Sequence, residues 1–143
     1  MNAEQINDKI ELCESAIDLI LSEGSFTIAQ LSEVTGKTAS QIYSLFPNKK
    51  AITEYYYPSL VIRYSAMIGE IEDFESYTIS EKLSNFIFTS FDMMEDRREF
   101  VEDTFEKMVF KLGCSSEFHQ EVTALFKHFF TTDGRIAVSA GFV

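Results

Sequence analysis

Residues 35–52, with the sequence TGKTASQIYSLFPNKKAI, concentrate hydrogen-bond donors in a chain whose formal charge is -11. Its ammonium groups are Lys37, Lys49 and Lys50, and the wider stretch 24–53 sets these three lysines against one acid, a net charge of +2. Hydroxyl groups stand between the lysines, at Thr38, Ser40 and Tyr43. Ammonium and hydroxyl donors are groups that proteins direct at phosphate oxygens. The segment therefore predicts noncovalent binding of an anion, in a protein whose overall charge repels anions.

Side chains that could make or break bonds do not gather in this way. His119 and His128 are nine residues apart, so they do not share a helix face at metal-binding spacing, and we interpret them as surface residues. Cys13 and Cys114 form no C-x-x-C pattern and no disulfide framework, which fits a reducing cytosol. A redox-sensing role for Cys114 stays open. Because no glycine-rich phosphate loop or serine-histidine-acid set occurs, we predict no enzyme, no metal and no cofactor.

Three helices are predicted before residue 47. In the segment INDKIELCESAIDLIL, apolar residues recur at steps of three and four, which is typical of an amphipathic helix, and Gly24 is placed to end it. Two short helices follow, each opened by a capping box in which a threonine hydroxyl and a glutamine amide satisfy backbone N–H groups. These boxes pair Thr27 with Gln30 and Thr38 with Gln41.

The two short helices should share one buried face. Gly36 separates them, because glycine readily adopts the left-handed conformation that stops a helix. We expect Leu31 and Val34 of the first short helix to be buried. In the second, the expected buried residues are Ile42, Leu45 and Phe46, and the helix should stop before Pro47.

Two short helices joined by a tight glycine-containing turn and packed against a preceding helix form a helix-turn-helix arrangement. The second short helix of such a unit enters the major groove of DNA with its N-terminal residues against the base edges. The expected DNA face consists of Thr38, Ala39, Ser40, Gln41 and Tyr43. Gln41 can pair with adenine, and Ala39 can contact a thymine methyl group. Two alternatives remain: Gln41 serves only its capping box, and Tyr43 is a half-buried packing residue.

Phosphate contacts are expected around this helix. Thr27 and Thr38 stand at helix N-termini, where free backbone N–H groups favour an anion. Lys37 and Lys49 flank the second short helix at its two ends. Phosphate contacts supply position and affinity, whereas base contacts supply sequence choice.

The rest of the chain also predicts helices. Asn48 can cap a helix that runs toward Ile68, and Pro58 should kink or break it. Thr78 with Glu81 predicts a further capping box, and either Ser115 or Ser116 should start another helix. Because the segment 134–143 begins a new apolar pattern and then stops, we expect more helix beyond residue 143.

Phenylalanine and methionine are concentrated in residues 83–130, and they offer walls for a small-molecule site. An apolar or aromatic effector would suit such walls, and a cationic one would suit the acidic surroundings. The alternative is that these side chains only form the core, since a chain with 14 phenylalanines must bury many of them. The candidate ligand-binding residues are Phe88, Phe91, Met94, Phe105 and Met108.

The run AIDLILSEGSFTIAQLSEVTGKTASQIYSLFPNKKAI resembles the DNA-binding head of the TetR (tetracycline repressor) family. The intervals of the family pattern agree throughout the first 52 residues or so. Matching positions are held by Gly24, Thr27, Leu31, Gly36, Thr38, Tyr43, Phe46 and Lys49. The chain departs from the pattern at Glu11 and Ala29, where many relatives carry arginine.

The resemblance implies a homodimeric transcriptional regulator, most often a repressor, that leaves a near-palindromic operator when an unknown small-molecule effector binds. Because alternation with period two is missing, we expect an all-α protein. The resemblance divides it into a helix-turn-helix DNA-binding domain at 1–53 and a helical effector-binding and dimerisation domain at 54–143, whose C-terminal part we expect to continue beyond residue 143. We expect the protein to bind double-stranded operator DNA and a second copy of the chain. We expect no contact with a membrane and a location in the cytoplasm. The alternative function is a helical protein–protein interaction module whose helix-turn-helix no longer binds DNA.

Overall fold

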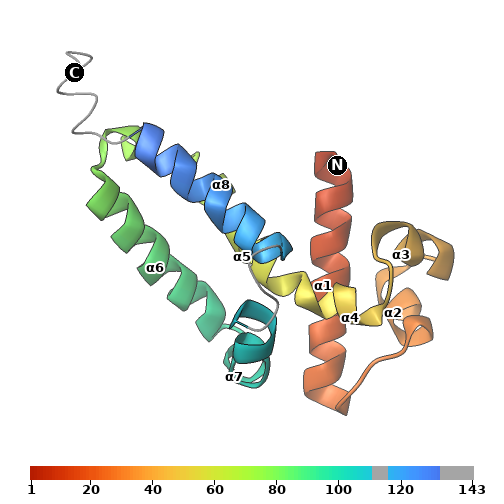
Figure 1. Cartoon of the computed structure of the whole chain (residues 1–143). Coiled ribbons are helices and arrows are strands. Elements are labelled where there is room, and N and C mark those ends of the chain that lie inside the picture. Colours follow the sequence, from red (N-terminus) through yellow and green to blue (C-terminus); the bar gives the residue numbers. More distant parts are fainter. Residues whose placement is uncertain (111–115, 133–143) are drawn as a thin grey trace.

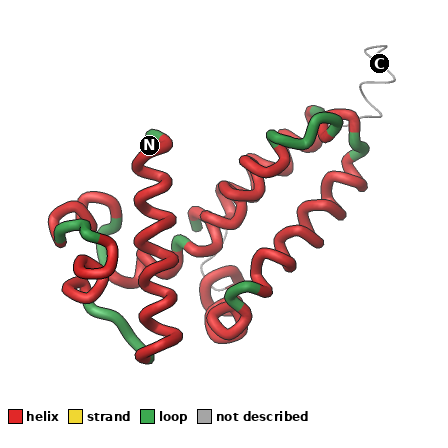
Figure 2. The backbone as a smooth tube through the Cα atoms, turned by 180° about the vertical axis from the view of Figure 1, so that it is seen from behind, coloured by secondary structure: helices red, strands yellow, loops and turns green. Residues whose placement is uncertain are grey.

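The chain folds into helices joined by short connections (Figure 1). The structure is a computed structural model that describes residues 1–110 and 116–132. Within these ranges it contains no strand, which confirms the predicted all-α class (Figure 2). The elements are α1 (Ala3–Glu23), α2 (Ile28–Thr35), α3 (Ala39–Leu45), α4 (Lys49–Glu54), α5 (Tyr56–Ile68), η1 (Phe74–Ser76), α6 (Ile79–Glu95), α7 (Arg98–Phe105), the π-helical turn η2 (Glu106–Phe110) and α8 (Glu117–Thr131).

The capping boxes predicted from the sequence are formed. The Thr27 hydroxyl accepts from the Gln30 N–H at 3.1 Å, and the Gln30 side chain accepts from the Thr27 N–H at 2.8 Å. The pairs at the starts of α3 and α6 have the same reciprocal geometry. A further box, Asn2 with Gln5, starts α1 ahead of the predicted apolar stripe. These boxes hold the helix starts at fixed residues, because each satisfies backbone N–H groups that a helix leaves unpaired.

Helices α1, α2 and α3 pack around one aliphatic centre. Leu12, Leu31 and Ile42 have no exposed surface, and Phe46 closes the end of α3. Val34 was predicted to be buried, and this prediction is wrong, because 58% of it is exposed. The buried face of α2 is centred between Leu31 and the partly buried Ile28. Val34, one turn further along the helix, lies beyond the edge of that face.

The long helix predicted after Asn48 is divided at Tyr55 into α4 and α5. Pro58 causes the division: it cannot donate to the Glu54 carbonyl, and its ring crowds that carbonyl. The proline itself lies in the first turn of α5, where no intrahelical donor is required. The predicted break is therefore confirmed, with the interruption a few residues before the proline.

Helices α5, α6 and α8 form an elongated unit, here called the arm, which extends away from α1–α4, here called the head (Figures 1 and 2). Tyr64, Phe74 and Phe129 lie in its buried centre. Ser116 is the N-cap of α8, so of the two predicted helix starts, Ser115 and Ser116, the second is confirmed. The apolar pattern expected at 134–143 lies outside the described residues.

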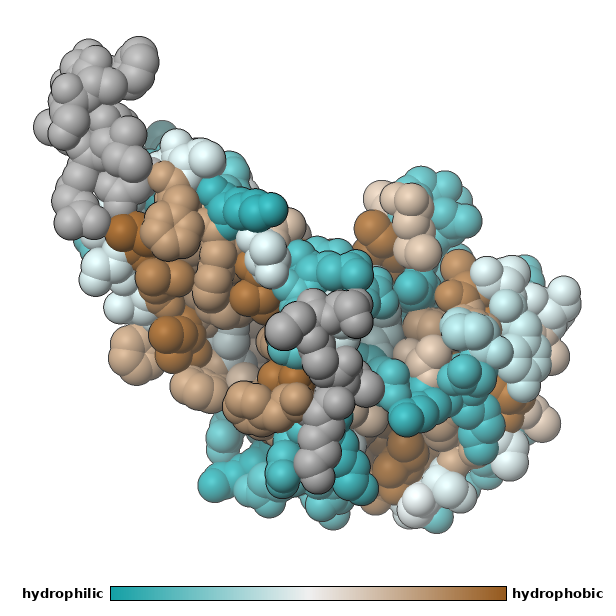
Figure 3. Space-filling model, in the orientation of Figure 1, coloured by the Kyte–Doolittle hydropathy of each residue, from teal (hydrophilic) through white to brown (hydrophobic). Residues whose placement is uncertain are grey.

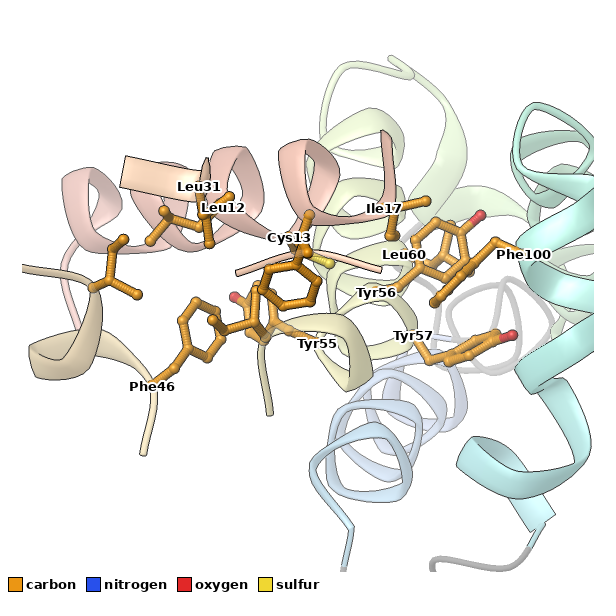
Figure 4. Packing of buried hydrophobic residues seen from close by; sticks show 14 of the residues in the cluster. Leu12, Cys13, Ile17, Leu31, Phe46, Tyr55, Tyr56, Tyr57, Leu60 and Phe100 are labelled. Atoms are coloured by element: carbon orange, nitrogen blue, oxygen red, sulfur yellow. The ribbon is translucent and has the colours of Figure 1, made fainter. Parts of the chain in front are cut away.

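One core joins the head to the first turns of the arm. Buried side chains continue from Leu31 through Tyr56 to Phe100 without a gap (Figure 4). The predicted domain boundary at residues 53 and 54 falls inside this core, and Thr53 itself is buried. Helix α5 therefore packs directly on α1 within this core. Among the described residues, no helix combines the length and apolar character that crossing a membrane requires.

Candidate nucleic-acid interface

The predicted DNA face of α3 is exposed to solvent. The residues that precede or begin the helix all lie on the surface: Thr38, Ala39, Ser40 and Gln41. Tyr43 is 51% exposed, so its ring reaches solvent, and this exposure also fits the half-buried packing residue of the alternative interpretation. Ile42 and Phe46 point into the core and fix the orientation of the helix. One side of a two-turn helix therefore anchors it, and the other presents hydroxyl, amide and phenol groups.

Gln41 is engaged in its capping box. Its Oε1 accepts from the Thr38 N–H at 2.8 Å, and its own N–H donates to the Thr38 hydroxyl at 3.1 Å. Pairing with adenine through both amide atoms would need the second lone pair of that oxygen, whereas the side-chain NH₂ group keeps both of its protons. Capping and base contact are thus compatible when Gln41 acts as a donor.

The capping threonines keep a proton for a second partner. In each cap the hydroxyl of Thr27 or Thr38 acts as an acceptor, and a hydroxyl has one donor hydrogen besides its acceptor lone pairs. Both residues are exposed. A phosphate oxygen next to either residue could accept that proton without breaking the helix start.

Lys37 is turned toward α1 instead of toward solvent. Its Nζ lies 2.9 Å from Glu11 Oε2 and 3.6 Å from Asp8 Oδ1, and the side chain is 17% exposed. The hydrogen bond to Glu11 raises the pKa of the ammonium group. Two carboxylates compensate its charge, so a phosphate contact would have to compete with them. The sequence did not reveal this, since Glu11 and Lys37 are 26 positions apart.

Lys49 and Lys50 carry the accessible positive charge. Lys49 is exposed at the start of α4, and its Nζ lies 4.8 Å from the centre of the Phe26 ring, a cation–π contact that leaves the remaining sides of the ammonium group to solvent. Lys50 is 77% exposed, and Glu54 Oε1 lies 3.6 Å from its Nζ. Lys49 is therefore the predicted phosphate contact with the least competition from acids.

Lys9 was not singled out in the sequence. It is 6% exposed, and its Nζ lies 5.0 Å from the Phe46 ring centre and 4.2 Å from that of Tyr55. The ammonium group joins α1 to the end of α3 and to the junction of α4 and α5. The available signal was its isolation, as the only basic residue of an acidic helix.

Arg97 forms a second connection that the sequence did not reveal. It lies between α6 and α7, and its guanidinium donates to Glu14 Oε2, at 2.9 Å from Nε, and to Asp18 on α1. Arg63 of α5 approaches the other Glu14 oxygen at 3.5 Å. These contacts join the first helix of the head to both α5 and the α6–α7 corner.

The candidate ligand-binding residues are only partly brought together. Phe91, Met94 and Phe105 line two neighbouring cavities of about 520 and 150 Å³. Met108 lines a different cavity of about 250 Å³, beside the α4–α5 junction. Phe88 is 70% exposed and lines none of these three.

The residues considered for bond-making chemistry remain apart. Cys13 is buried, and burial raises the pKa of its thiol, which makes it a poor nucleophile. His119 contacts Ser116, and His128 lies 3.2 Å from Glu75. Within the described ranges, no three His, Cys, Asp or Glu side chains converge to hold a metal ion. Cys114 lies outside the described residues.

The fold is all-α. Its third helix, α3, packs on a small aliphatic core and exposes a polar face to solvent. Comparison with protein-family models, curated proteins and solved structures finds no match to this chain.

Proposed function

We propose that the chain is a ligand-responsive DNA-binding regulator of the TetR type, which acts as a homodimer and most often as a repressor. The observation that supports this best is the division of α3 into a buried anchor, Ile42 and Phe46, and an exposed polar face. Such a face can enter a major groove without unfolding its support. The resemblance of the first 52 residues to the TetR head supports the same proposal independently.

The proposed DNA contacts separate into two kinds. Ser40 and Gln41 contact base edges, Ala39 lies against a thymine methyl group, and the Tyr43 phenol donates to a phosphate. Thr27, Thr38 and Lys49 contact phosphates. Lys37 adds little, because Glu11 and Asp8 already bind its ammonium group. A dimer would place two α3 helices about 34–36 Å apart on a near-palindromic operator.

Effector binding in the arm would change that spacing through α5 and Arg97. Tyr57 and Leu60 of α5 line the 150 Å³ cavity, and α5 also packs on α1. A molecule that displaced α5 would shift the head by direct contact. The Arg97 contacts with Glu14 and Asp18 provide a second route from the α6–α7 corner to α1.

The test is DNA binding by the 143-residue chain, with duplexes selected from a random pool and affinities measured by fluorescence anisotropy at two salt concentrations. Gln41→Ala should weaken binding to the selected duplex by about 1–3 kcal/mol and relax preference at one base pair. Gln5→Ala is the matched control, because it removes the same kind of capping bond from the start of α1 without touching a proposed DNA contact. Equal losses for the two variants would show that Gln41 only caps its helix, and salt-independent binding would reject the DNA face.

The second candidate is a protein–protein interaction module that uses the same surface. The neutralisation of Lys37 by two acids favours it, since this lowers the positive charge next to α3. In that case no duplex from the random pool would be retained at low salt.

A further inference from the structure

A cavity of about 520 Å³ lies between the C-terminal half of α6 and α7. Its apolar wall consists of Phe91, Met94, Val101 and Phe105. The volume is within the usual range of about 300–1,000 Å³ for small-molecule sites. Phe91 is 60% exposed, so its ring is accessible from solvent. The cavity can therefore hold a bulky apolar group without rearrangement of the core.

The cavity adjoins a smaller compartment of about 150 Å³ that lies deeper, between α5, α6, α7 and α8. Phe91, Met94 and Phe105 line both spaces. The other walls of the inner compartment are apolar apart from Ser90 and the Tyr57 hydroxyl, and that hydroxyl is bonded to Thr104 at 2.9 Å. An aromatic or alkyl group in the outer cavity would thus have an apolar compartment next to it.

The polar rim of the outer cavity is acidic. Glu95, Glu102 and Glu106 line it together with one cation, Arg98, and the two carboxylates that Arg98 contacts exceed its charge by one. The Arg98 guanidinium donates to Glu95 Oε1 at 3.2 Å and to Glu102 Oε1 at 3.1 Å. Hydrophilic residues surround the end of the molecule where α6 meets α7, and apolar residues cover the face above it (Figure 3). An anionic guest would meet repulsion at this rim, and a cationic one attraction.

We propose that this cavity is the binding site for a lipophilic monocation, meaning a molecule with an aromatic or alkyl body and one positive nitrogen or phosphorus. The body lies against Met94 and Val101, and the charge lies between the aromatic rings of Phe91 and Phe105 and the carboxylates of the rim. Aromatic faces attract cations, and the acidic rim adds to that attraction. A neutral guest of the same shape would gain from the wall but not from the rim.

The position of the site suits a regulatory role, and this part of the inference rests on the proposed function. Arg98 follows directly after Arg97, which is bonded to Glu14 and Asp18 of α1. A cation that competes with Arg98 for Glu95 and Glu102 would change the start of α7 at the residue next to that connection. Occupancy of the cavity would then alter the orientation of α1 and the affinity for DNA.

The experiment uses isothermal titration calorimetry of the full chain with tetraphenylphosphonium, and with tetraphenylborate as an anion of the same shape. We expect the cation to bind at least about tenfold more tightly than the anion, since each rim charge acts with opposite sign on the two probes. Equal affinities, or tighter binding of the anion, would overturn the proposal.

Rim variants then locate the binding. Arg98→Gln should tighten binding of the phosphonium by about two- to fivefold, because it leaves both carboxylates to the guest, and Glu102→Gln should weaken it by a similar factor. Glu70→Gln, an exposed substitution between α5 and η1, is the matched control and should have no effect. If Glu70→Gln weakens binding as much as Glu102→Gln does, the cation binds to the acidic surface in general and the site is wrong.

The same preparations should be titrated with the selected duplex. If the phosphonium binds with the expected dependence on the rim but no duplex binds, the site stands and the DNA-binding proposal fails. If duplex binding is intact and the phosphonium does not bind, the site proposal alone is wrong.

Discussion

The head and the arm differ in the side chains that they bury and in those that they expose to solvent. The head buries mainly aliphatic residues, such as Leu12, Leu31 and Ile42, and presents a polar face on α3. The arm buries aromatic residues, such as Tyr64 and Phe129, and leaves apolar ones on its surface. Stretch 24–53 carries a net charge of +2, whereas residues 70–106 contain twelve acids and three bases.

The difference shows how an acidic chain can separate two binding chemistries. Local capping bonds fix the head, so its outer face is free to carry donors for a polyanion. Where α6 meets α7 and η2, acids at the rim and phenylalanines in the wall would combine attraction for positive charge with apolar contact. Under the two proposals, each surface would repel the other's ligand, because the charges of the two ligands are opposite.

The largest expected effect tests whether the arm depends on its aromatic core. Phe129 is fully buried and contacts Phe74 and Phe126, with ring centres 5.8 and 6.1 Å apart. Phe129→Ala should lower the free energy of unfolding by about 3–5 kcal/mol, measured by urea titration with far-UV circular dichroism.

Its neighbour provides the control. Phe130 is 60% exposed, so Phe130→Ala should change the same quantity by less than about 0.5 kcal/mol. A loss as large for Phe130 as for Phe129 would mean that the exposed apolar face of the arm is covered in solution.

The next effect tests the connection between the two regions. Arg97→Gln removes charged hydrogen bonds to Glu14 and Asp18, and should cost about 1.5–3 kcal/mol of unfolding free energy. Arg98→Gln removes only contacts between exposed side chains and should leave the urea midpoint unchanged. Equal behaviour of the two variants would show that Arg97 does not join the head to the arm.

The pH dependence tests burial on both sides of the junction. Burial raises the pKa of Tyr55 to about 12, with Glu117 and Glu121 adding to the effect, and burial alone raises that of Tyr64 to about 12. Because the folded pKa exceeds the ordinary value of 10.0, this contribution to stability is complete below pH 10.0 and is lost as the pH rises toward about 12.

Urea titrations across that interval measure the effect. We expect Tyr64→Phe to make stability less dependent on pH above 10.0, since one ionisable hydroxyl is removed. A pH dependence identical to that of the unchanged chain would contradict the buried position of this phenol.

The smallest expected effect concerns the charge of the head. Lys49→Ala should weaken binding to every duplex by a similar factor and lower the slope of log affinity against log salt by about 1. Lys127→Ala, an exposed lysine on α8, should leave the slope unchanged. A slope unchanged by Lys49→Ala would place that residue away from the DNA backbone.

The helices of the head follow from signals within a few residues of one another. Thr27 with Gln30 and Thr38 with Gln41 specify two helix starts, and Gly24 and Gly36 occur at positive φ where helices end. Each signal is a local hydrogen bond or backbone preference, so it can be inferred before the fold is known. The all-α class and the break before Pro58 could be predicted for the same reason.

Val34 marks where such inference fails. Its spacing from Leu31 suits a buried stripe, but burial depends on how far α1 and α3 cover a two-turn helix, and this is a property of the packed unit. The neutralisation of Lys37 by Glu11 is of the same kind, since its partner lies on another helix.

The sequence by itself determined where α2 and α3 begin and end and which side chains could meet an anion, because those properties depend on neighbouring residues. Only the tertiary structure decided which lysines remain accessible, which phenylalanines line a cavity, and that Arg97 reaches Glu14 across 83 positions. The physical reason is that charge pairing and cavity walls require surfaces from separate helices, whose contacts arise only when the core has packed.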